Sequence, residues 1–334
     1  MNTMFRRLRA TGRIVIITLL VWFVTDQSIR IFNIASVMPA HFNRQNEQRQ
    51  PAPYIEFKGA PGRLDHDRYG YRWVPDTVEA GALKIAFFGG STGYNGDPPI
   101  ASLIESRLNA GGRTRVQVAN FSVVSSNHRQ HLHNILESRS LFQPDVVIFY
   151  GGYNETLQTA YYDPRPGFPY NFFFRRETSP LGQFLMQYSP TFYMLDDMLT
   201  KQGIGGLTPL AALRKQEAPF SERWNRAIAR NYFDTMDLAR SVTASFRSQH
   251  CGKAVFLFFY QPYQVPDGFR QVHDGIRKTI GDYGFGYDLS DTFEKRNMDV
   301  FTDIVHVTQR GRETMAAEIT ARLESNAEFR RCSR

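Results

Sequence analysis

The stretch LKIAFFGGSTG, residues 83–93, begins an alternation of apolar runs and helical patterns that continues through the rest of the chain. Its apolar core, residues 85–88, stops at Gly89 and Gly90, which is typical of a short buried strand followed by a sharp turn. Ser91 follows this turn directly. Because the ends of parallel strands build ligand sites, Ser91 is the first candidate site residue.

Further apolar runs of strand length recur after this stretch and alternate with helical patterns. The expected strands lie at residues 116–119, 146–150 and 255–259, with a weak one near 287–288. The expected helices lie at 101–108, 131–141, 227–247, near Ile276 and at 309–324, the last with Thr308 as its N-cap. Strands that alternate with helices predict a parallel sheet covered on both faces. We therefore predict an α/β fold, a flavodoxin-like three-layer αβα sandwich with strand order 2-1-3-4-5.

Polar side chains stand where such a sheet binds ligands, beyond the carboxyl ends of its strands. Ser91 follows the first strand, Asn154 follows the third, and Asp303 and His306 precede the last helix. Serine is a weak nucleophile and needs a base to take its proton. An Asp three residues before a His can bind Nδ1 of the imidazole, which leaves Nε2 to accept that proton. An Asn side chain offers an N–H to the oxyanion that acyl transfer generates, so these residue types predict a serine hydrolase.

Each of these clusters also has an ordinary structural explanation. Ser91 can belong to a simple Gly–Ser turn, Asp303 can cap its own turn beside a surface His306, and Asn154 is a common turn residue. A phosphate-binding loop is disfavoured at Ser91 because no Lys follows in the required pattern. The segment also fits the nucleophile elbow of α/β-hydrolases, but there the Ser follows several strands and the acid lies far from the His.

Taken in order, these segments resemble the SGNH (GDSL-type) hydrolases over about residues 83–325. The matching blocks are the first strand with residues 89–92, then 120–122, 152–154 and 303–308, the last followed by Gly311 and Ala316. Each block is short, whereas the whole set in the right order is specific. The resemblance supports the three-layer sandwich and implies a serine esterase that needs no metal or organic cofactor.

The resemblance also implies a role for each residue at the site. Ser91 is expected to be the nucleophile, His306 its base and Asp303 the residue that orients His306. The expected oxyanion hole consists of the backbone amides of Ser91 and Ser122 and the side chain of Asn154. Two positions depart from the family pattern: Ser122 stands where Gly is usual, and Glu155 stands where Asp usually follows the Asn.

The N-terminus has the pattern of a targeting segment. Four arginines precede an apolar run at residues 14–24, as in a signal peptide or signal anchor. The run is short for a bilayer span of about 20 residues, and Asp26 and Arg30 interrupt its extension. An uncleaved single-pass anchor is the preferred interpretation, and a cleaved signal or an interfacial helix stays open. Arginines on the leading side predict that the rest of the chain lies outside the cytoplasm, on the periplasmic side.

Composition limits the remaining possibilities. Hydrophobic residues make up 42% of the chain and charged residues 22%, which is typical of a globular protein with a core. The net charge is +8, but the basic residues are scattered and no nucleic-acid motif is present, so we expect a solvated basic surface. The two cysteines, Cys251 and Cys332, suggest neither a metal site nor a disulfide framework, although outside the cytoplasm they can pair.

Three other clusters are candidates for function. His128, His131 and His133 can bind a metal, but a solvated helix is the preferred interpretation. Residues 170–176, rich in Phe and flanked by Arg, form either a sugar or lipid platform or the core of an insertion, with the core preferred. Residues 260–263 follow the fourth strand and are candidates for the pocket wall.

The predicted organisation has three parts. Residues 1–40 form a signal anchor, residues 41–82 form a linker and lead-in, and residues 83–330 form the hydrolase domain, with an insertion at about 157–225. The expected activity is cleavage of O-acyl esters, with O-acetyl groups on a cell-surface polysaccharide first and lipid esters second. The alternatives are acyl transfer to a sugar hydroxyl by the same triad, and a non-catalytic polysaccharide-binding or scaffold protein. No nucleic-acid partner is expected.

Overall fold

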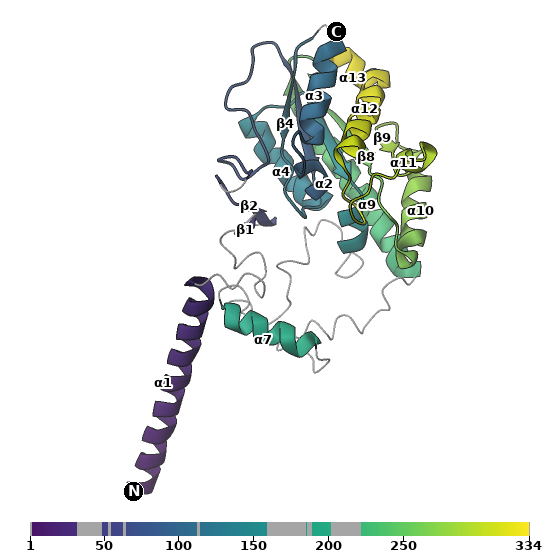
Figure 1. The fold of residues 1–334 in the computed structure, drawn as a ribbon. Coiled ribbons are helices and arrows are strands. Elements are labelled where there is room, and N and C mark those ends of the chain that lie inside the picture. The colour runs from purple at the N-terminus through teal and green to yellow at the C-terminus, as the bar shows by residue number, and fades with distance from the viewer. Residues whose placement is uncertain are drawn as a thin grey trace. The chain divides into compact units, whose positions relative to one another are not determined.

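The computed structural model describes residues 2–31, 49–52, 55–62, 65–111, 114–158, 185, 189–201 and 222–333. The chain divides into two compact units. One unit comprises residues 1–48 and 176–217, and the other comprises residues 49–175 and 218–334. The second unit carries the sheet and its helices (Figure 1).

The second unit is built on a parallel sheet, and the predicted strand order is confirmed. Among the described residues its strands are β3 (Leu83–Gly89), β4 (Val116–Asn120), β5 (Val146–Gly151), β8 (Val255–Tyr260) and β9 (Gly286–Asp288). They lie in the order β4-β3-β5-β8-β9, with every neighbouring pair parallel, which is the order 2-1-3-4-5. The carboxyl ends of β3 and β5, which precede Ser91 and Asn154, therefore lie side by side.

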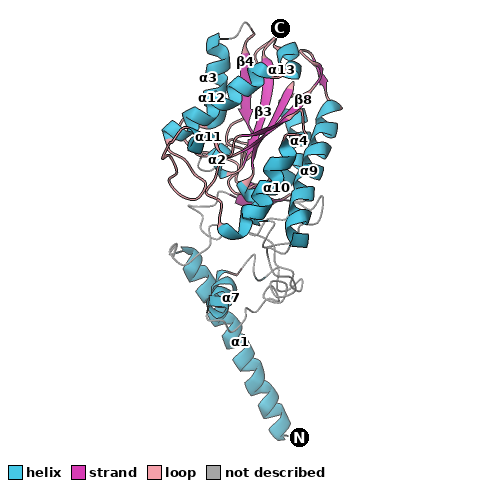
Figure 2. Cartoon of the chain, turned by 90° about the vertical axis from the view of Figure 1, so that its right-hand side faces the viewer, coloured by secondary structure: helices cyan, strands magenta, loops and turns pink. Residues whose placement is uncertain are grey.

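Helices cover both faces of the sheet, as the three-layer prediction requires (Figure 2). On one face α3 (Ile100–Gly111) packs against α12 (Gln309–Ser325). On the other face α9 (Glu222–Ala244) packs between α4 (His128–Leu141) and α10 (Arg270–Ile280). The predicted N-cap of α12 is confirmed, because the Thr308 side chain accepts a hydrogen bond from the Gly311 amide.

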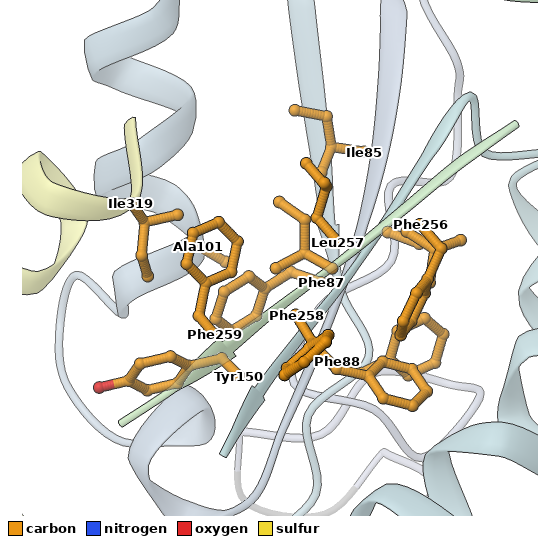
Figure 3. Packing of buried hydrophobic residues seen from close by; sticks show 14 of the residues in the cluster. Ile85, Phe87, Phe88, Ala101, Tyr150, Phe256, Leu257, Phe258, Phe259 and Ile319 are labelled. Atoms are coloured by element: carbon orange, nitrogen blue, oxygen red, sulfur yellow. The ribbon is translucent and has the colours of Figure 1, made fainter. Parts of the chain in front are cut away.

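Aromatic side chains on the two faces of the sheet make most of the core. Successive residues of a strand point to opposite faces, and in Figure 3 Phe87 and Phe259 lie toward Ile319 of α12, whereas Phe88 and Phe256 lie on the other side. All five residues are at most 2% exposed. Burying one such side chain contributes about 1.5–3 kcal/mol relative to leaving it in water. The strand that ends just before Ser91 is therefore rigidly held.

The lead-in to the sheet contains a small hairpin that the sequence pattern did not predict. Strands β1 (Arg49–Ala52) and β2 (Glu56–Gly59) pair antiparallel within the segment interpreted as a linker. Phe57 and Tyr71 of this lead-in belong to the main hydrophobic core. Trp73 forms a bridge with Asn120 at the end of β4. The lead-in thus extends the edge of the sheet.

Cys251 and Cys332 form a disulfide, with their Cα atoms 4.5 Å apart. Cys332 is the last residue of α13 (Ala327–Cys332), and Cys251 directly precedes β7 (Gly252–Lys253), which pairs with β6 (Arg247–Ser248). The bond joins residues 81 positions apart. It therefore links the C-terminal helix to the segment that begins β8.

Replacing both cysteines with serine is expected to destabilise the second unit. In the chain-entropy model a loop of this length contributes roughly 4 kcal/mol, which corresponds to a fall in Tm on the order of 10 °C for a domain of this size. Thermal unfolding of the full chain in detergent, followed by circular dichroism, measures the change. Reduction of the wild-type chain should give the same shift, and a Tm unaffected by both treatments would contradict the expected contribution.

The first unit contains α1 (Asn2–Ile31) and α7 (Pro190–Lys201). The window Thr11–Ile29 of α1 is, within the described ranges, the single helix long and apolar enough to cross a membrane. Asp26, which interrupts the apolar run, accepts hydrogen bonds from Ser189 Oγ at 3.0 Å and from the Thr191 amide at 2.9 Å. The carboxylate is therefore partnered by Ser189 and the first turn of α7 rather than exposed.

Candidate active site

The glycines around Ser91 allow close packing at the end of β3. Ser91 begins the short helix α2 (Ser91–Tyr94), and Gly90 is its N-cap. A Cβ atom on Gly90 would collide with Nδ2 of Asn154, and one on Gly93 would collide with Oγ of Ser122. A side chain at either position would push these neighbours away. The sequence GGSTG is therefore explained by contact between Ser91's turn and the two neighbouring strand ends.

The structure brings Ser91, His306 and Asp303 into one chain of hydrogen bonds. Ser91 Oγ lies 2.7 Å from His306 Nε2, although the two residues are 215 positions apart. His306 Nδ1 lies 2.6 Å from Asp303 Oδ2. The side chain of His306 is 31% exposed and that of Asp303 is 52% exposed, so the site is open to solvent.

The loop that carries Asp303 and His306 is a tight turn closed on itself. Phe301 and Val307 form an antiparallel bridge across it, and the Thr302 amide donates to the His306 carbonyl at 2.8 Å. Asp303 Oδ1 accepts from the backbone amides of Val305 at 2.8 Å and His306 at 2.7 Å. Asp303 therefore both shapes the turn and holds the imidazole, which its three-residue spacing predicted.

The electrostatics of the turn keep Asp303 ionised. Partial burial raises the pKa of this carboxyl, but hydrogen bonds from the His306 ring and from the amides of His306 and Val305 outweigh it and lower the pKa to about 2. The carboxylate is thus present throughout the range in which a neutral imidazole can act as a base. With Nδ1–H donated to this carboxylate, the lone pair of His306 Nε2 faces Ser91.

Asn154 reaches the same place from the neighbouring strand. It begins the π-helical turn η1 (Asn154–Gln158), shortly after β5. Gly152 has a φ of 146°, and a Cβ there would strike the Tyr260 ring, so only glycine fits this turn. Asn154 Nδ2 donates to the Ser126 carbonyl at 2.8 Å. Because a side-chain amide has two N–H groups, one remains for a substrate oxygen beside Gly90 and Ser91.

The backbone amide of Ser122, which was expected to be an oxyanion donor, already has a hydrogen-bond acceptor. It is 0% exposed, and its amide donates to Asn120 Oδ1 at 3.1 Å. A buried amide that already has an acceptor is poorly placed to meet a substrate, so we do not retain Ser122 as an oxyanion donor. The backbone that meets Gly90 and Asn154 is that of Ser126, which follows Ser125 with its left-handed φ of 65°. No local signal in the sequence separates these positions of one loop.

The preferred interpretation of the histidine cluster is wrong for two of its three members. His128 is 1% exposed and His131 is 0% exposed, so this helix face is buried rather than solvated, and His133 is exposed. Burial lowers the pKa of His131 to about 3, and burial together with His131 lowers the pKa of His128 well below its ordinary value. Among the described residues, no group of three or more His, Cys, Asp or Glu is arranged to hold a metal.

The segment after β8 forms hydrogen bonds with both turns that carry the site residues. Gln261 is 2% exposed and accepts a hydrogen bond from Thr92 Oγ1 at 2.6 Å. The Gln264 amide donates to the Ile304 carbonyl at 2.8 Å, within the turn that carries His306. Residues 260–263 are therefore buried behind the site and do not line an open wall. The aromatic segment 170–176 lies outside the described residues.

Comparisons with known proteins give structural likenesses only. No family model matches the chain, and no curated protein matches it. One similar structure is LAE5, an alpha/beta hydrolase enzyme from the metagenome of Lake Arreo, Spain, with 12% identity, 73% of this chain and 95% of that chain covered, and a TM-score of 0.43.

Two others are an acetyl xylan esterase, AlAXEase (12% identity, 72% and 99% covered, TM-score 0.40), and the lipase/acylhydrolase from Enterococcus faecalis (13% identity, 72% and 95% covered, TM-score 0.38). At this identity and TM-score the likenesses give no residue-by-residue correspondence.

Proposed function

We propose that this chain is a membrane-anchored serine esterase that cleaves O-acyl esters outside the cytoplasm. The observation that carries the proposal is the hydrogen-bonded chain from Ser91 Oγ through His306 to Asp303 at the carboxyl edge of the sheet. A nucleophile, a base and a residue that orients the base are the elements of acyl transfer through a covalent intermediate. The chemistry needs no metal and no organic cofactor.

The proposed reaction has two halves. As Ser91 Oγ attacks the ester carbonyl, His306 Nε2 takes its proton, and the carbonyl oxygen becomes an oxyanion stabilised by the Ser91 amide and Asn154 Nδ2. Collapse of this intermediate breaks the bond to the alcohol oxygen, which receives the proton from His306. Water then attacks the acyl-enzyme with His306 as base, and the carboxylate product leaves as Ser91 recovers its proton.

The openness of the site favours a large alcohol component. His306 and Asp303 are partly exposed, so a polymer can approach the edge of the sheet without a deep pocket. We propose O-acetyl groups on a cell-surface polysaccharide as the first substrate class, with lipid esters second. Release of acetate from an O-acetylated polysaccharide by the wild-type chain, and not by a Ser91→Ala chain, tests this.

The same assay separates hydrolysis from transfer. The assay is run with and without an added unacetylated polysaccharide. If the added polysaccharide becomes acetylated and acetate is released only in its absence, the chain is an acyltransferase. If neither product forms with folded wild-type chain, and Ser91 does not react with a fluorophosphonate, the non-catalytic binding protein is the better account. Each outcome therefore assigns one of the three candidate functions.

The location is proposed from two features. Arg6, Arg7, Arg9 and Arg13 precede the candidate span Thr11–Ile29 or lie at its start, which by the positive-inside rule leaves the sheet-bearing unit outside the cytoplasm. The Cys251–Cys332 disulfide agrees with an oxidising compartment. Protease accessibility of the C-terminus in spheroplasts tests the orientation.

Asn154→Ala is expected to lower kcat about 10²–10³-fold, because one oxyanion donor is worth that much in enzymes of this chemistry. The matched variant Asn154→Asp keeps the shape but replaces the donor with a carboxylate, so it should be no more active than Asn154→Ala. Hydrolysis of 4-nitrophenyl acetate, with Tm as the folding control, measures both. Activity within about threefold of wild type in either variant would remove Asn154 from the oxyanion hole.

A further inference from the structure

A ring of buried hydrogen bonds lies directly behind the proposed oxyanion donors. Glu155 Oε1 accepts from the His128 amide at 2.8 Å, and His128 Nδ1 lies 3.1 Å from His131 Nδ1. His131 Nε2 lies 2.7 Å from Ser126 Oγ. The Ser126 carbonyl accepts from Asn154 Nδ2 at 2.8 Å, and Asn154 is covalently joined to Glu155. We call these five residues the buried ring.

The buried ring joins the elements on either side of Ser91. Ser126 belongs to the loop after β4, His128 and His131 form the first turn of α4, and Asn154 and Glu155 follow β5. Ser126 Oγ also bonds the carbonyl of Gly89, the last residue of β3. The position of the Asn154 amide beside Gly90 therefore depends on groups from several separate segments.

The proton positions in the buried ring can be assigned by counting donors. Burial keeps both rings neutral, so each has one N–H. The Ser126 hydroxyl donates to a backbone carbonyl, that of Val123 at 2.7 Å or that of Gly89 at 3.1 Å. His131 therefore donates from Nε2, and its Nδ1 accepts from His128 Nδ1–H. This leaves His128 Nε2 bare, which agrees with the absence of a partner for that atom among the described residues.

Both carboxylate oxygens of Glu155 accept hydrogen bonds within the buried ring or beside it. Oε1 accepts from the His128 amide and also lies 3.4 Å from His128 Nδ1, whereas Oε2 accepts from the Gly152 amide at 2.6 Å. The side chain is 8% exposed. Two converging backbone N–H groups need an acceptor on each oxygen. An ionised carboxylate provides both, the hydroxyl oxygen of a carboxylic acid is a weaker acceptor, and the NH₂ group of an amide does not accept.

We propose that Glu155, His128 and His131 are positioning residues that hold Asn154 against Ser91's turn, and that the ionised form of Glu155 is the form that does so. The inference rests on the proposed esterase function, because it assigns the buried ring to the geometry of the oxyanion hole. It predicts that a proton on Glu155 slows reaction at Ser91 without touching Ser91, His306 or the substrate.

The charge on Glu155 changes near neutral pH. Burial raises the pKa of Glu155 to about 7, against the lowering effects of the amides of Glu155, Gly152 and His128 and of the Arg129 charge. The titratable or charged groups that face it are His128 and Arg129 from α4, Tyr232 from α9 and Tyr263 after β8. Because the pKa is raised, the carboxyl is protonated below about pH 7, and the competent ring exists above that pH.

The test measures how fast a fluorophosphonate labels Ser91 in the full chain between pH 4.5 and 9. The phosphonyl adduct carries an oxygen in the oxyanion position, so its rate of formation reports the donors. Other effects of pH on the reaction are shared with Glu155→Gln, so the ratio of the wild-type labelling rate to the Glu155→Gln rate reports the charge on Glu155. This ratio should fall as the pH drops through about 7. Glu155→Gln should label roughly tenfold slower than wild type at pH 8, since its NH₂ must face a backbone N–H. The difference should shrink toward pH 5, where the wild-type carboxyl is protonated.

Further variants keep the result interpretable. Glu155→Asp retains a carboxylate but not the reach of the longer side chain, so it should label more slowly than wild type at pH 8. Ser126→Ala removes a hydrogen-bond partner of the His131 ring and should slow labelling while keeping Glu155. If Glu155→Gln does not fold, a wild-type labelling rate in Ser126→Ala would overturn the positioning role of the buried ring. Glu137→Gln changes another carboxylate of α4, which binds Lys58 and Tyr71, and should leave the labelling rate at its wild-type value at every pH.

The outcomes separate this inference from the proposed function. If wild-type chain does not label at Ser91 at all, the esterase proposal fails. If wild type labels, and folded Glu155→Gln labels at the wild-type rate at pH 8, the esterase proposal stands and the positioning role of the buried ring is overturned. A lower Tm for Glu155→Gln, with a ratio of wild-type to variant labelling rates that does not change with pH, would reduce Glu155 to a structural residue.

Discussion

Ser91→Ala is expected to reduce hydrolysis of 4-nitrophenyl acetate at least about 10⁴-fold, to the residual activity that the oxyanion donors alone provide. The reason is that Ser91 Oγ is the group hydrogen-bonded to His306 Nε2, so its loss removes the covalent intermediate and leaves the base without its proton donor. The initial rate at saturating substrate, with purified full chain in detergent, measures the effect.

The fold of this variant should be unchanged. Ser91 is partly exposed, and its hydroxyl bonds a partly exposed imidazole rather than a buried group. The matched control is Ser106→Ala, which removes an exposed hydroxyl of α3 that bonds its own helix at the Ser102 carbonyl. Ser106→Ala should keep wild-type activity. Comparable activity in the Ser91 and Ser106 variants would exclude Ser91 as the nucleophile.

Asp303→Asn is expected to lower kcat roughly 10³–10⁴-fold while leaving KM nearly unchanged. The amide oxygen of the introduced side chain can still accept from the backbone amides of the turn, so the loop should keep its shape. Its NH₂ group then faces His306 Nδ1, which stabilises the tautomer with the proton on Nε2. That tautomer presents a donor to Ser91 and cannot accept its proton.

The matched control for this variant is Asp299→Asn, since Asp299 is an exposed carboxylate four residues earlier in the chain. It should retain wild-type kcat. Because the pKa of Asp303 is lowered to about 2, its own ionisation does not change between pH 4 and 9, so the wild-type profile in that range should carry no step from this residue. An Asp303→Asn chain with kcat within tenfold of wild type would show that His306 is oriented by another group.

Much of the fold could be predicted because its signals are strong and local. The two central strands β3 and β5 contain apolar runs, such as VVIFY at residues 146–150, that stop at paired glycines, and the predicted bounds match β5 closely. The Asp303–His306 spacing was also sufficient, because a single turn sets the geometry between those residues. The contact between Ser91 and His306 needed the sheet order as well, since 215 positions separate them.

The features that were missed depend on burial, which a single sequence does not encode for polar residues. His128 and His131 look like a solvated helix face, yet both pack against the Phe149 ring. A usable signal did exist: Asn127 and Gln130 form a capping box, which starts α4 at His128 rather than at the predicted position 131. For Ser122 no such signal existed, because the sequence of the loop after β4 does not show in which direction each backbone amide points.

The most direct test of the central claim is to identify the residue that reacts. Folded full chain in detergent is treated with a fluorophosphonate, digested and analysed by mass spectrometry. The account predicts a single phosphonyl adduct on the peptide containing Ser91, formed by wild type and absent from His306→Ala and Asp303→Asn over the same time. A stable adduct at another serine, or none at Ser91 in folded wild-type chain, would contradict it.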